Sequence, residues 1–338
     1  MYNDKGYLDI DYILNNDIPF IFLVGARGIG KSYGLLKWLY ENNKGKKFIY
    51  MRRTEAEIEY CASNEGNPFS PINLDLNINI EIRKVNQRIK GFYDGDTCIG
   101  YLMSLSTFYS KRSVSFVDVD YLFFDEFIPE KNARPIKNEA EAFFNSIETI
   151  SRNREIQDKG LLRVICASNS NTLDNPLFLE LGIVSRALKM VNKKIAYYKD
   201  EQRGFILLLP FDSPISKKKK ETSLYKLTNQ SKNFTNMALE NEFNDDVSEQ
   251  IISKNLKQYI PLCHVGEIYI YKHKQERMYY ISEHKTSTFE KEYGTGLMDL
   301  LRFKKDNQFL WFSYLQKRIN FESYTQQLLF EKYFSLKA

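Results

Sequence analysis

The chain has 338 residues, of which 43% are hydrophobic and 27% charged, so it is globular and long enough for two domains with cores of their own. Its net charge is +5, and from residue 251 onward it holds 14 basic and 9 acidic residues, which places the excess in the C-terminal part. Such an excess suggests an acidic partner there, for example nucleic acid.

Composition also excludes several classes of protein. The segment up to Asp17 is polar and mixed in charge, and no apolar run approaches the ~20 residues that cross a bilayer, so we expect neither a signal peptide nor a membrane partner. The three histidines show no ligand spacing with a cysteine, which argues against a zinc site. The cysteines are scattered and indicate buried thiols in a reducing cytosol: Cys61, Cys98, Cys166 and Cys263.

The first predicted strand, residues 21–24, leads into a glycine loop and then a helix over residues 33–40. This is the context in which G-x-x-x-x-G-K-[ST] binds the phosphates of ATP, because the loop amides and the helix N-terminus face the anion. We expect Lys31 to reach the β- and γ-phosphates and the Ser32 hydroxyl to ligate Mg²⁺. The predicted nucleotide-binding loop is Gly25, Ala26, Arg27, Gly28, Ile29, Gly30, Lys31 and Ser32.

Strand and helix patterns alternate up to about residue 200, which predicts an α/β layered domain. Short apolar runs bounded by polar turns predict the strands, and apolar residues at helical spacing predict the helices. In chain order we expect a strand over 47–51, a helix over 55–60, strands over 78–84, 88–93, 98–101 and 121–124, a helix over 138–152, and strands over 161–167 and 205–209.

The strand over 121–124 ends in two carboxylates, Asp125 and Glu126. Asp125 at the strand tip is expected to hold Mg²⁺. Glu126 then points toward the γ-phosphate, where it orients and deprotonates water, so the pair favours hydrolysis. The strand over 161–167 leads to Asn169, which is either a sensor of the γ-phosphate or a helix cap.

The long stretch between Lys31 and Asp125 leaves room for a strand inserted between the two motif strands, as in the additional-strand catalytic-Glu class of P-loop ATPases. Arg152 and Arg154 end the helix that follows. They are either surface charges at a helix C-terminus or arginines that reach a neighbouring subunit's γ-phosphate in a ring. Further basic candidates are Lys111 and Arg112, acting in trans, and Arg27, acting in cis.

The chain changes character after residue 205. Residues 206–250 are rich in Asn, Ser and Thr and are expected to form a linker or lid, with the lysine run 217–220 as a solvated surface. The division is then an ATPase domain over 1–205, the linker, and a basic domain over 251–338. In the last domain we expect a hairpin from 268–271 and 278–281, and helices over 299–303 and 308–334.

Together these residues resemble the DNA-packaging ATPases of phi29-like tailed phages. The most specific features are the glycine loop with Ala-Arg between its first two glycines and the Arg-Asn-Arg-Glu run. The resemblance covers the first 200 residues well and the hairpin near 266–282 more weakly. It is carried by residues 25–32, 48–53, 124–128, 152–155, 168–169 and 175–176.

The resemblance implies a P-loop NTPase fold of the additional-strand catalytic-Glu type, with a smaller α+β C-terminal domain that resembles a degenerate RNase H-like nuclease. In this reading Lys31 and Ser32 bind the phosphates of ATP and Mg²⁺. Asp125 is the metal residue, Glu126 is the catalytic base and Arg152 is the finger supplied in trans. Either Lys111 or Arg112 matches a basic position at subunit interfaces.

The same resemblance implies a homo-oligomeric ring, pentameric in the family, at the portal vertex of a procapsid in the host cytoplasm. The ring drives double-stranded DNA into the shell. Double-stranded DNA, portal protein and a structural packaging RNA are the partners that the resemblance implies, and the sequence does not distinguish whether the basic C-terminal domain binds RNA, portal protein or DNA. Its first hairpin strand lacks the central Asp of a working nuclease, so nuclease activity is not expected.

Two alternatives stay open at this point. A helicase-like or AAA-type ATPase acting on other nucleic acids would share the nucleotide site but not the portal partner. A non-hydrolysing nucleic-acid-binding assembly protein would keep only a relict nucleotide site. DNA-stimulated hydrolysis of ATP separates the relict assembly protein from the two ATPases. Co-purification with a portal ring separates the packaging ATPase from the helicase-like one.

Overall fold

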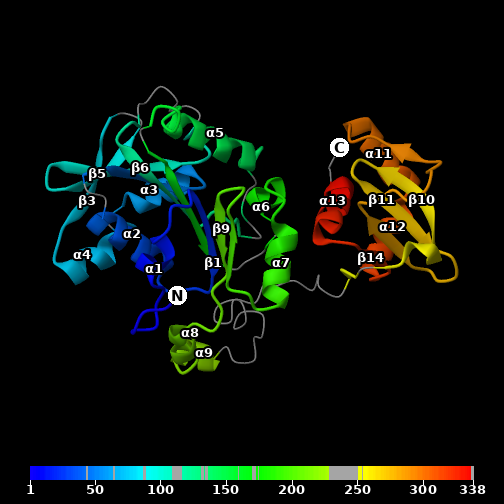
Figure 1. Ribbon diagram of the computed structural model, residues 1–338, viewed down its shortest axis with the longest axis horizontal. Helices are drawn as coiled ribbons and strands as arrows, with labels where there is room; N and C mark the ends of the chain where they lie inside the picture. Colours follow the sequence, from blue (N-terminus) through cyan, green and yellow to red (C-terminus); the bar gives the residue numbers. More distant parts are fainter. Residues whose placement is uncertain are drawn as a thin grey trace. The chain divides into compact units, whose positions relative to one another are not determined.

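The computed structural model describes residues 1–42, 45–63, 65–86, 89–108, 116–130, 133, 136–158, 160–169, 173, 175–227, 250–252 and 254–335. The chain divides into two compact units, Met1–Glu180 with Ala187–Asn244 and Leu181–Arg186 with Asp245–Ala338 (Figure 1). Each unit has a sheet of its own. In the described part of the chain, no helix combines the length and the apolar character that a membrane crossing requires.

The first unit is built on a nine-stranded sheet in the order β3-β4-β5-β2-β6-β7-β1-β9-β8. The strands from β5 to β9 in this order are parallel, and antiparallel hairpins flank them at both edges. Strand β7 lies between β1 and β6, but it follows Asp125 in the chain; the stretch between Lys31 and Asp125, where we expected room for the inserted strand, instead supplies β2 to β5 on the other side of β6. The strands are β1 (Phe20–Gly25), β2 (Lys47–Arg52), β3 (Ile80–Lys84), β4 (Lys90–Asp94), β5 (Thr97–Ser104), β6 (Val119–Asp125), β7 (Arg163–Asn169), β8 (Tyr197–Asp200) and β9 (Phe205–Leu208).

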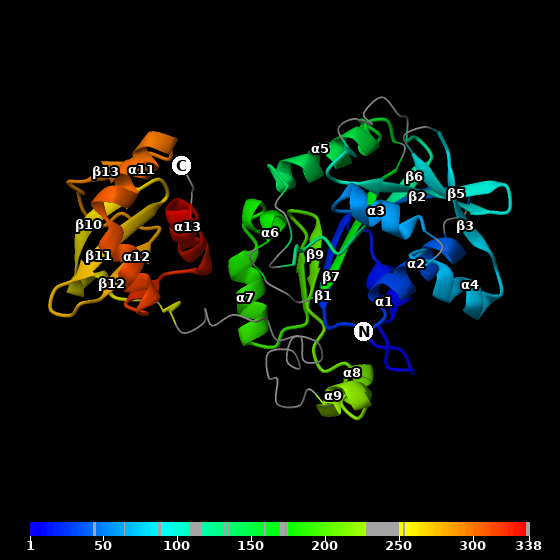
Figure 2. The same cartoon turned by 180° about the vertical axis from the view of Figure 1, so that it is seen from behind.

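Helices cover both faces of this sheet, so its central strands β1, β6, β7 and β9 are buried on both sides (Figure 1). Phe123 faces the core shared with α1 to α4, whereas Phe124 stacks on Phe143 of α5 with ring centroids 5.4 Å apart. Phe178 of α6 meets Phe22 of β1 on that second face at 5.7 Å. Figure 2 shows the same layers from behind. The helices of this unit are α1 (Ile10–Leu14), α2 (Lys31–Asn42), α3 (Glu55–Cys61), α4 (Ser70–Leu76), α5 (Glu139–Ser151), α6 (Pro176–Glu180), α8 (Pro214–Lys219) and α9 (Ser223–Leu227), and α7 (Val184–Asn192) crosses the boundary between the units.

The predicted elements of the first unit are present, with ends that differ by a few residues. Helix α2 begins at Lys31, inside the glycine loop, and the strand predicted over 161–167 ends later, at Asn169. Strand β9 pairs with β1 from Phe20↔Phe205 to Leu23↔Leu208. The sheet therefore extends past residue 205, where we expected the ATPase domain to end.

The second unit contains a five-stranded sheet in the order β13-β10-β11-β12-β14. The antiparallel pair of β11 and β12 confirms the predicted hairpin. The single helix predicted over 308–334 is wrong, because Lys317 at φ +55° ends the first helix and β14 then pairs with β12. The elements are β10 (Tyr259–Val265), β11 (Ile268–His273), β12 (Tyr279–Ser282), β13 (Glu292–Tyr293), α11 (Leu297–Asp306), α12 (Gln308–Leu315), β14 (Ile319–Phe321), α13 (Tyr324–Ser335) and the short 3₁₀ helix η3 (Leu256–Gln258). The RNase H-like character of this unit stays a prediction.

Candidate active site

The candidate site lies where β1, β6 and β7 end. In the sheet register Gly25 stands beside Asn169, and Asp125 stands beside Ala167. Because neighbouring parallel strands present their carboxyl ends at one edge of the sheet, the glycine loop and the polar residues of two further strands converge there. Three motifs far apart in the sequence are thus brought together as predicted.

Lys31 is buried, with 7% of its surface exposed. Its Nζ donates to the carbonyl oxygens of Gly25 at 2.8 Å and Ala26 at 2.7 Å, and to Oδ1 of Asn169 at 3.0 Å. Burial lowers the pKa of Lys31 to about 7, although the nearby carboxylates oppose this shift. The ammonium is therefore held by weak carbonyl acceptors at the place where the motif is expected to bind phosphate.

Asp125 is buried and accepts two hydrogen bonds. Ser32 Oγ donates to its Oδ1 at 3.0 Å and Tyr50 Oη donates to its Oδ2 at 2.9 Å. Burial raises the pKa of Asp125, and the Arg52 guanidinium opposes the shift. No group of three or more His, Cys, Asp or Glu side chains in the described residues is arranged to hold a metal. A hydroxyl and one carboxylate instead fit Mg²⁺ shared with substrate phosphates.

Glu126 follows β6 in a left-handed conformation, with φ +53°, and its side chain is half exposed. Its Oε2 lies 2.5 Å from Nη2 of Arg52, at the end of the neighbouring strand β2. Arg52 Nη1 also lies 3.7 Å from Oδ2 of Asp125. The expected base is thus paired with a cation that also faces the expected metal ligand.

Arg52 is in turn positioned by the start of α3. Its Nη2 donates to Oε1 of Glu57 at 3.1 Å, while Oε2 of Glu57 accepts from the backbone N–H of Thr54 at 2.7 Å. Thr54 and Glu57 form a capping box, which fixes this glutamate. Sequence reasoning did not assign Arg52 to the site. The available signal was its place at the end of a strand predicted to lie in the same parallel sheet as the Asp-Glu strand.

Arg27 lines a cavity of about 420 Å³ together with Lys31, Asp125 and Glu126. Its Nη2 lies 3.2 Å from Oε1 of Glu130, and both side chains are exposed. An exposed ion pair contributes only ~0–1 kcal/mol, so phosphate competes readily for this arginine. A role of Arg27 in cis stays a prediction.

The structure does not support the trans-acting role expected of Arg154. This arginine is buried, and it donates to the carbonyl oxygen of Val119 at 2.5 Å and to Oδ1 of Asp120 at 2.8 Å. Both acceptors stand at the start of β6, so the guanidinium is used within its own subunit.

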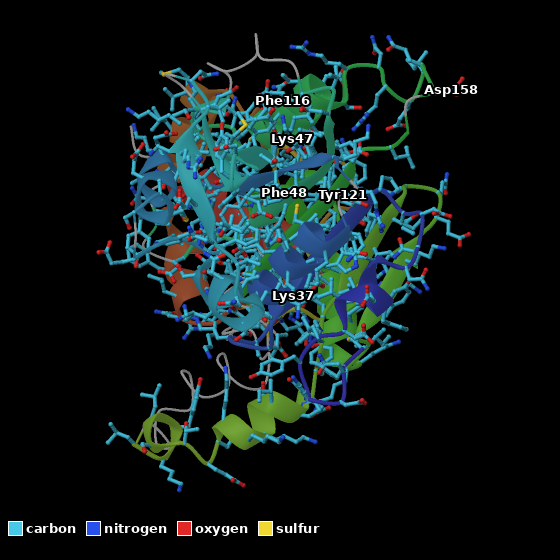
Figure 3. The ribbon with its side chains drawn as sticks, turned by 90° about the vertical axis from the view of Figure 1, so that its left-hand side faces the viewer. Lys37, Lys47, Phe48, Phe116, Tyr121 and Asp158 are labelled. Atoms are coloured by element: carbon cyan, nitrogen blue, oxygen red, sulfur yellow. The ribbon has the colours of Figure 1, made fainter. Side chains whose placement is uncertain are left out.

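Arg152 is exposed and caps α5 with φ +41°. Strand β6 has seven residues, so its start, where Arg154 binds, lies ~20 Å from Asp125 at its end. Arg152, two residues before Arg154, belongs to the same end of the sheet as Arg154. The turn after Arg152 projects from the rest of the unit, with Asp158 at its tip (Figure 3). Lys111 and Arg112 lie outside the described residues.

Comparison with known proteins places the chain in a family. A sequence model of the podovirus DNA encapsidation protein (Gp16) matches residues 1–310. The DNA packaging protein of Bacillus phage phi29 is 33% identical over 261 residues, covering 76% of this chain and 69% of the relative. That of Bacillus phage B103 is 31% identical over 290 residues, covering 83% and 81%.

Two solved assemblies share the fold. A chain of the bacteriophage Phi-29 viral genome packaging motor superposes with a TM-score of 0.71 at 22% identity, covering 97% of this chain and 98% of that one. A chain of the Phi-28 gp11 DNA packaging motor superposes with a TM-score of 0.64 at 19% identity, covering 98% and 99%. The family model over residues 1–310 and the two relatives above 30% identity show that this chain belongs to the podovirus DNA encapsidation protein (Gp16) family.

Proposed function

We propose that this chain is the DNA-packaging ATPase of a phage packaging motor, which hydrolyses ATP to drive double-stranded DNA into a procapsid. The observation that carries the proposal is the convergence of a phosphate loop and an Asp-Glu pair at one sheet edge. Lys31 Nζ donates to Asn169 Oδ1 at the end of β7, and Ser32 Oγ donates to Asp125 Oδ1 at the end of β6. Family membership supports the DNA substrate.

Binding of ATP exchanges weak partners for strong ones. Lys31 leaves the carbonyls of Gly25 and Ala26 for phosphate oxygens, and Asn169 stays within reach as a sensor. Ser32 and Asp125 would hold Mg²⁺, which neutralises charge on the phosphates. Arg27 would add a second cation in the lining of the cavity.

Glu126 is the proposed base for the attacking water. Because Arg52 occupies its Oε2, that contact must lengthen before this oxygen accepts a proton. Arg52 keeps Glu57 and Asp125 as partners when it does so. Proton transfer to this oxygen thus requires a rearrangement between two strand ends.

A ring is part of the proposal. Arg152 belongs to the sheet edge away from its own glycine loop, so its proposed action on ATP requires a neighbouring subunit. Lys111 or Arg112 is a second proposed interface cation. We propose assembly of the ring, pentameric in this family, on the portal of a procapsid in the host cytoplasm, with a structural packaging RNA as a further partner.

We also retain the division into an ATPase domain, a linker or lid, and a basic C-terminal domain. The basic excess after residue 251 favours nucleic acid or the portal as partner of the last domain. Binding through phosphates would weaken steeply with added salt. Nuclease activity is not expected of it.

The test is DNA packaging itself. The full chain is mixed with procapsids that carry a portal, with DNA and with ATP, and DNA protected from added nuclease is measured. Protection with the native chain and its loss in Lys31→Ala are expected. DNA-stimulated hydrolysis without protection would favour the helicase-like alternative, and DNA binding without any hydrolysis would favour the relict assembly protein.

A further inference from the structure

A segment that follows the central sheet lies against the glycine loop. The ring of Pro210 stands 3.4 Å from the point that a Cβ on Gly25 would occupy. Two contacts tie the next residues to the N-terminal segment: Tyr2 Oη donates to the carbonyl oxygen of Phe211 at 2.8 Å, and Pro214 stands 3.0 Å from a Cβ position on Gly6. Helix α8 lies beside the N-terminus accordingly (Figure 1).

Helix α8 ends with Lys219, which reaches the loop. Its Nζ donates to the carbonyl oxygen of Arg27 at 2.8 Å. A Cβ on Gly28 would stand only 1.9 Å from this Nζ, so the ammonium occupies the space that the glycine leaves open. Ile215, one helical turn earlier, packs on the core of the first unit and anchors the helix.

Among the described residues, the partner of the Lys219 charge is a backbone carbonyl. Within the described ranges it makes no ion pair, and burial lowers its pKa. Its charge adds to that of Arg27 in lowering the pKa of Lys31. A carbonyl oxygen is a weak acceptor for an ammonium, whereas a phosphate oxygen makes a stronger, charge-assisted bond.

We propose that Lys219 is a nucleotide-binding residue, whose ammonium exchanges the Arg27 carbonyl for a phosphate oxygen when ATP or ADP occupies the loop. The exchange rests on the proposed ATPase function and deepens it, because it makes the position of α8 depend on the nucleotide. Nucleotide binding thereby changes the position of the segment after β9, which leads toward the second unit along the chain.

The other lysines of α8 supply matched controls. Lys217 and Lys218 are exposed on the same helix, so Lys218→Ala removes an equal charge without touching the loop. Lys219→Gln keeps a donor for the Arg27 carbonyl but removes the charge. Lys219→Arg keeps the charge.

The experiment measures dissociation constants of ADP and of a non-hydrolysable ATP analogue for the full chain. Loss of one charge-assisted hydrogen bond predicts about tenfold weaker binding for Lys219→Ala and Lys219→Gln, with near-native binding for Lys219→Arg and Lys218→Ala. A loss confined to the ATP analogue assigns the contact to the γ-phosphate, and an equal loss for ADP assigns it to the inner phosphates.

Two results would overturn the proposal. Native affinity in Lys219→Ala shows that the residue does not bind nucleotide, and native affinity in Lys219→Gln reduces its role to support of the loop. Lys31→Ala is measured in parallel, because it tests the loop itself. If the native chain binds neither nucleotide, or if Lys31→Ala binds both normally, the ATPase function falls as well; if only Lys31→Ala is impaired, the Lys219 proposal alone fails.

Discussion

Arg52 and Glu126 are paired at 2.5 Å across the ends of two neighbouring parallel strands, β2 and β6. The pairing puts a guanidinium between the expected catalytic base and Asp125, which lies 3.7 Å from the same side chain. One arginine therefore contacts both carboxylates, the buried Asp125 and the half-exposed Glu126.

The stability role of Arg52 concerns Asp125. Arg52→Met leaves this buried carboxylate without its cation, so the free energy of unfolding should fall by up to the ~3–5 kcal/mol seen when buried pairs are broken. Denaturant unfolding measures it. Burial raises the pKa of Asp125, so the loss should be largest above that pKa and shrink as acid protonates the carboxylate.

Two comparisons test this explanation. In combination with Asp125→Asn, the effect of Arg52→Met should be smaller than in the native background. Arg27→Met breaks an exposed pair with Glu130 and should change stability little. Additive losses in the double variant would show that the two side chains are not coupled.

The base is tested by Glu126→Gln. The amide keeps the shape but accepts no proton, so hydrolysis should fall by ~10²–10⁴-fold while ATP still binds. Steady-state hydrolysis and equilibrium binding are measured side by side. Glu130→Gln, which changes a carboxylate of the same cavity, should keep most of its activity. Loss of ATP affinity with normal turnover of bound ATP would reverse the roles.

The low pKa of Lys31 predicts proton uptake on binding ATP. Burial lowers this pKa from 10.5 to about 7 in the free site, so the side chain is mostly neutral at about pH 8.5. Bound phosphates favour the ammonium, and binding should then take up close to one proton. Calorimetry in buffers of different ionisation enthalpy measures it.

The same shift has a consequence for stability without nucleotide. Between about pH 7 and pH 10.5 the unfolded chain holds the Lys31 proton and the folded chain does not. The contribution of this group to stability therefore rises with pH across that window. In the calorimetry, ATP binding without any proton uptake at about pH 8.5 would contradict both expectations, because it would show that Lys31 is already charged in the free site.

The trans finger is tested by Arg152→Ala. If Arg152 completes a neighbour's site, ATP should still bind while hydrolysis falls by ~10³-fold or more. Subunits with Arg152→Ala and subunits with Glu126→Gln are each inactive alone. Mixed rings bring an intact Glu126 to an intact Arg152 at some interfaces, so DNA-stimulated hydrolysis should partly recover.

Arg154→Ala is the matched control for that experiment. Because Arg154 is buried on Val119 and Asp120, its loss should lower thermal stability, whereas Arg152→Ala should leave the melting temperature near the native value. Absence of recovery in rings shown to be mixed would assign Arg152 to a structural role.

The glycine loop and the Asp-Glu strand were readable from the sequence because their chemistry is local. A loop that binds phosphate needs glycines at set spacing, and the strand that carries Asp125 must be apolar because helices cover both of its faces. The position of Asn169 could be predicted for the same reason, because it is the polar residue at the end of a buried strand. The helix predicted over 308–334 failed because pairing of β14 with β12, a contact between distant residues, overrode the local pattern.

Other parts of the site were decided only by the tertiary structure. Arg52 and Arg154 both follow apolar elements and look alike in the sequence, yet one faces Glu126 and the other is buried at the opposite sheet edge. Lys219 belongs to a lysine run that we interpreted as solvated surface, and only the packing of α8 brings it to the glycine loop. The partner of a long charged side chain depends on the strands and helices that surround it, and neighbours in space are not encoded in the residues beside it in the chain.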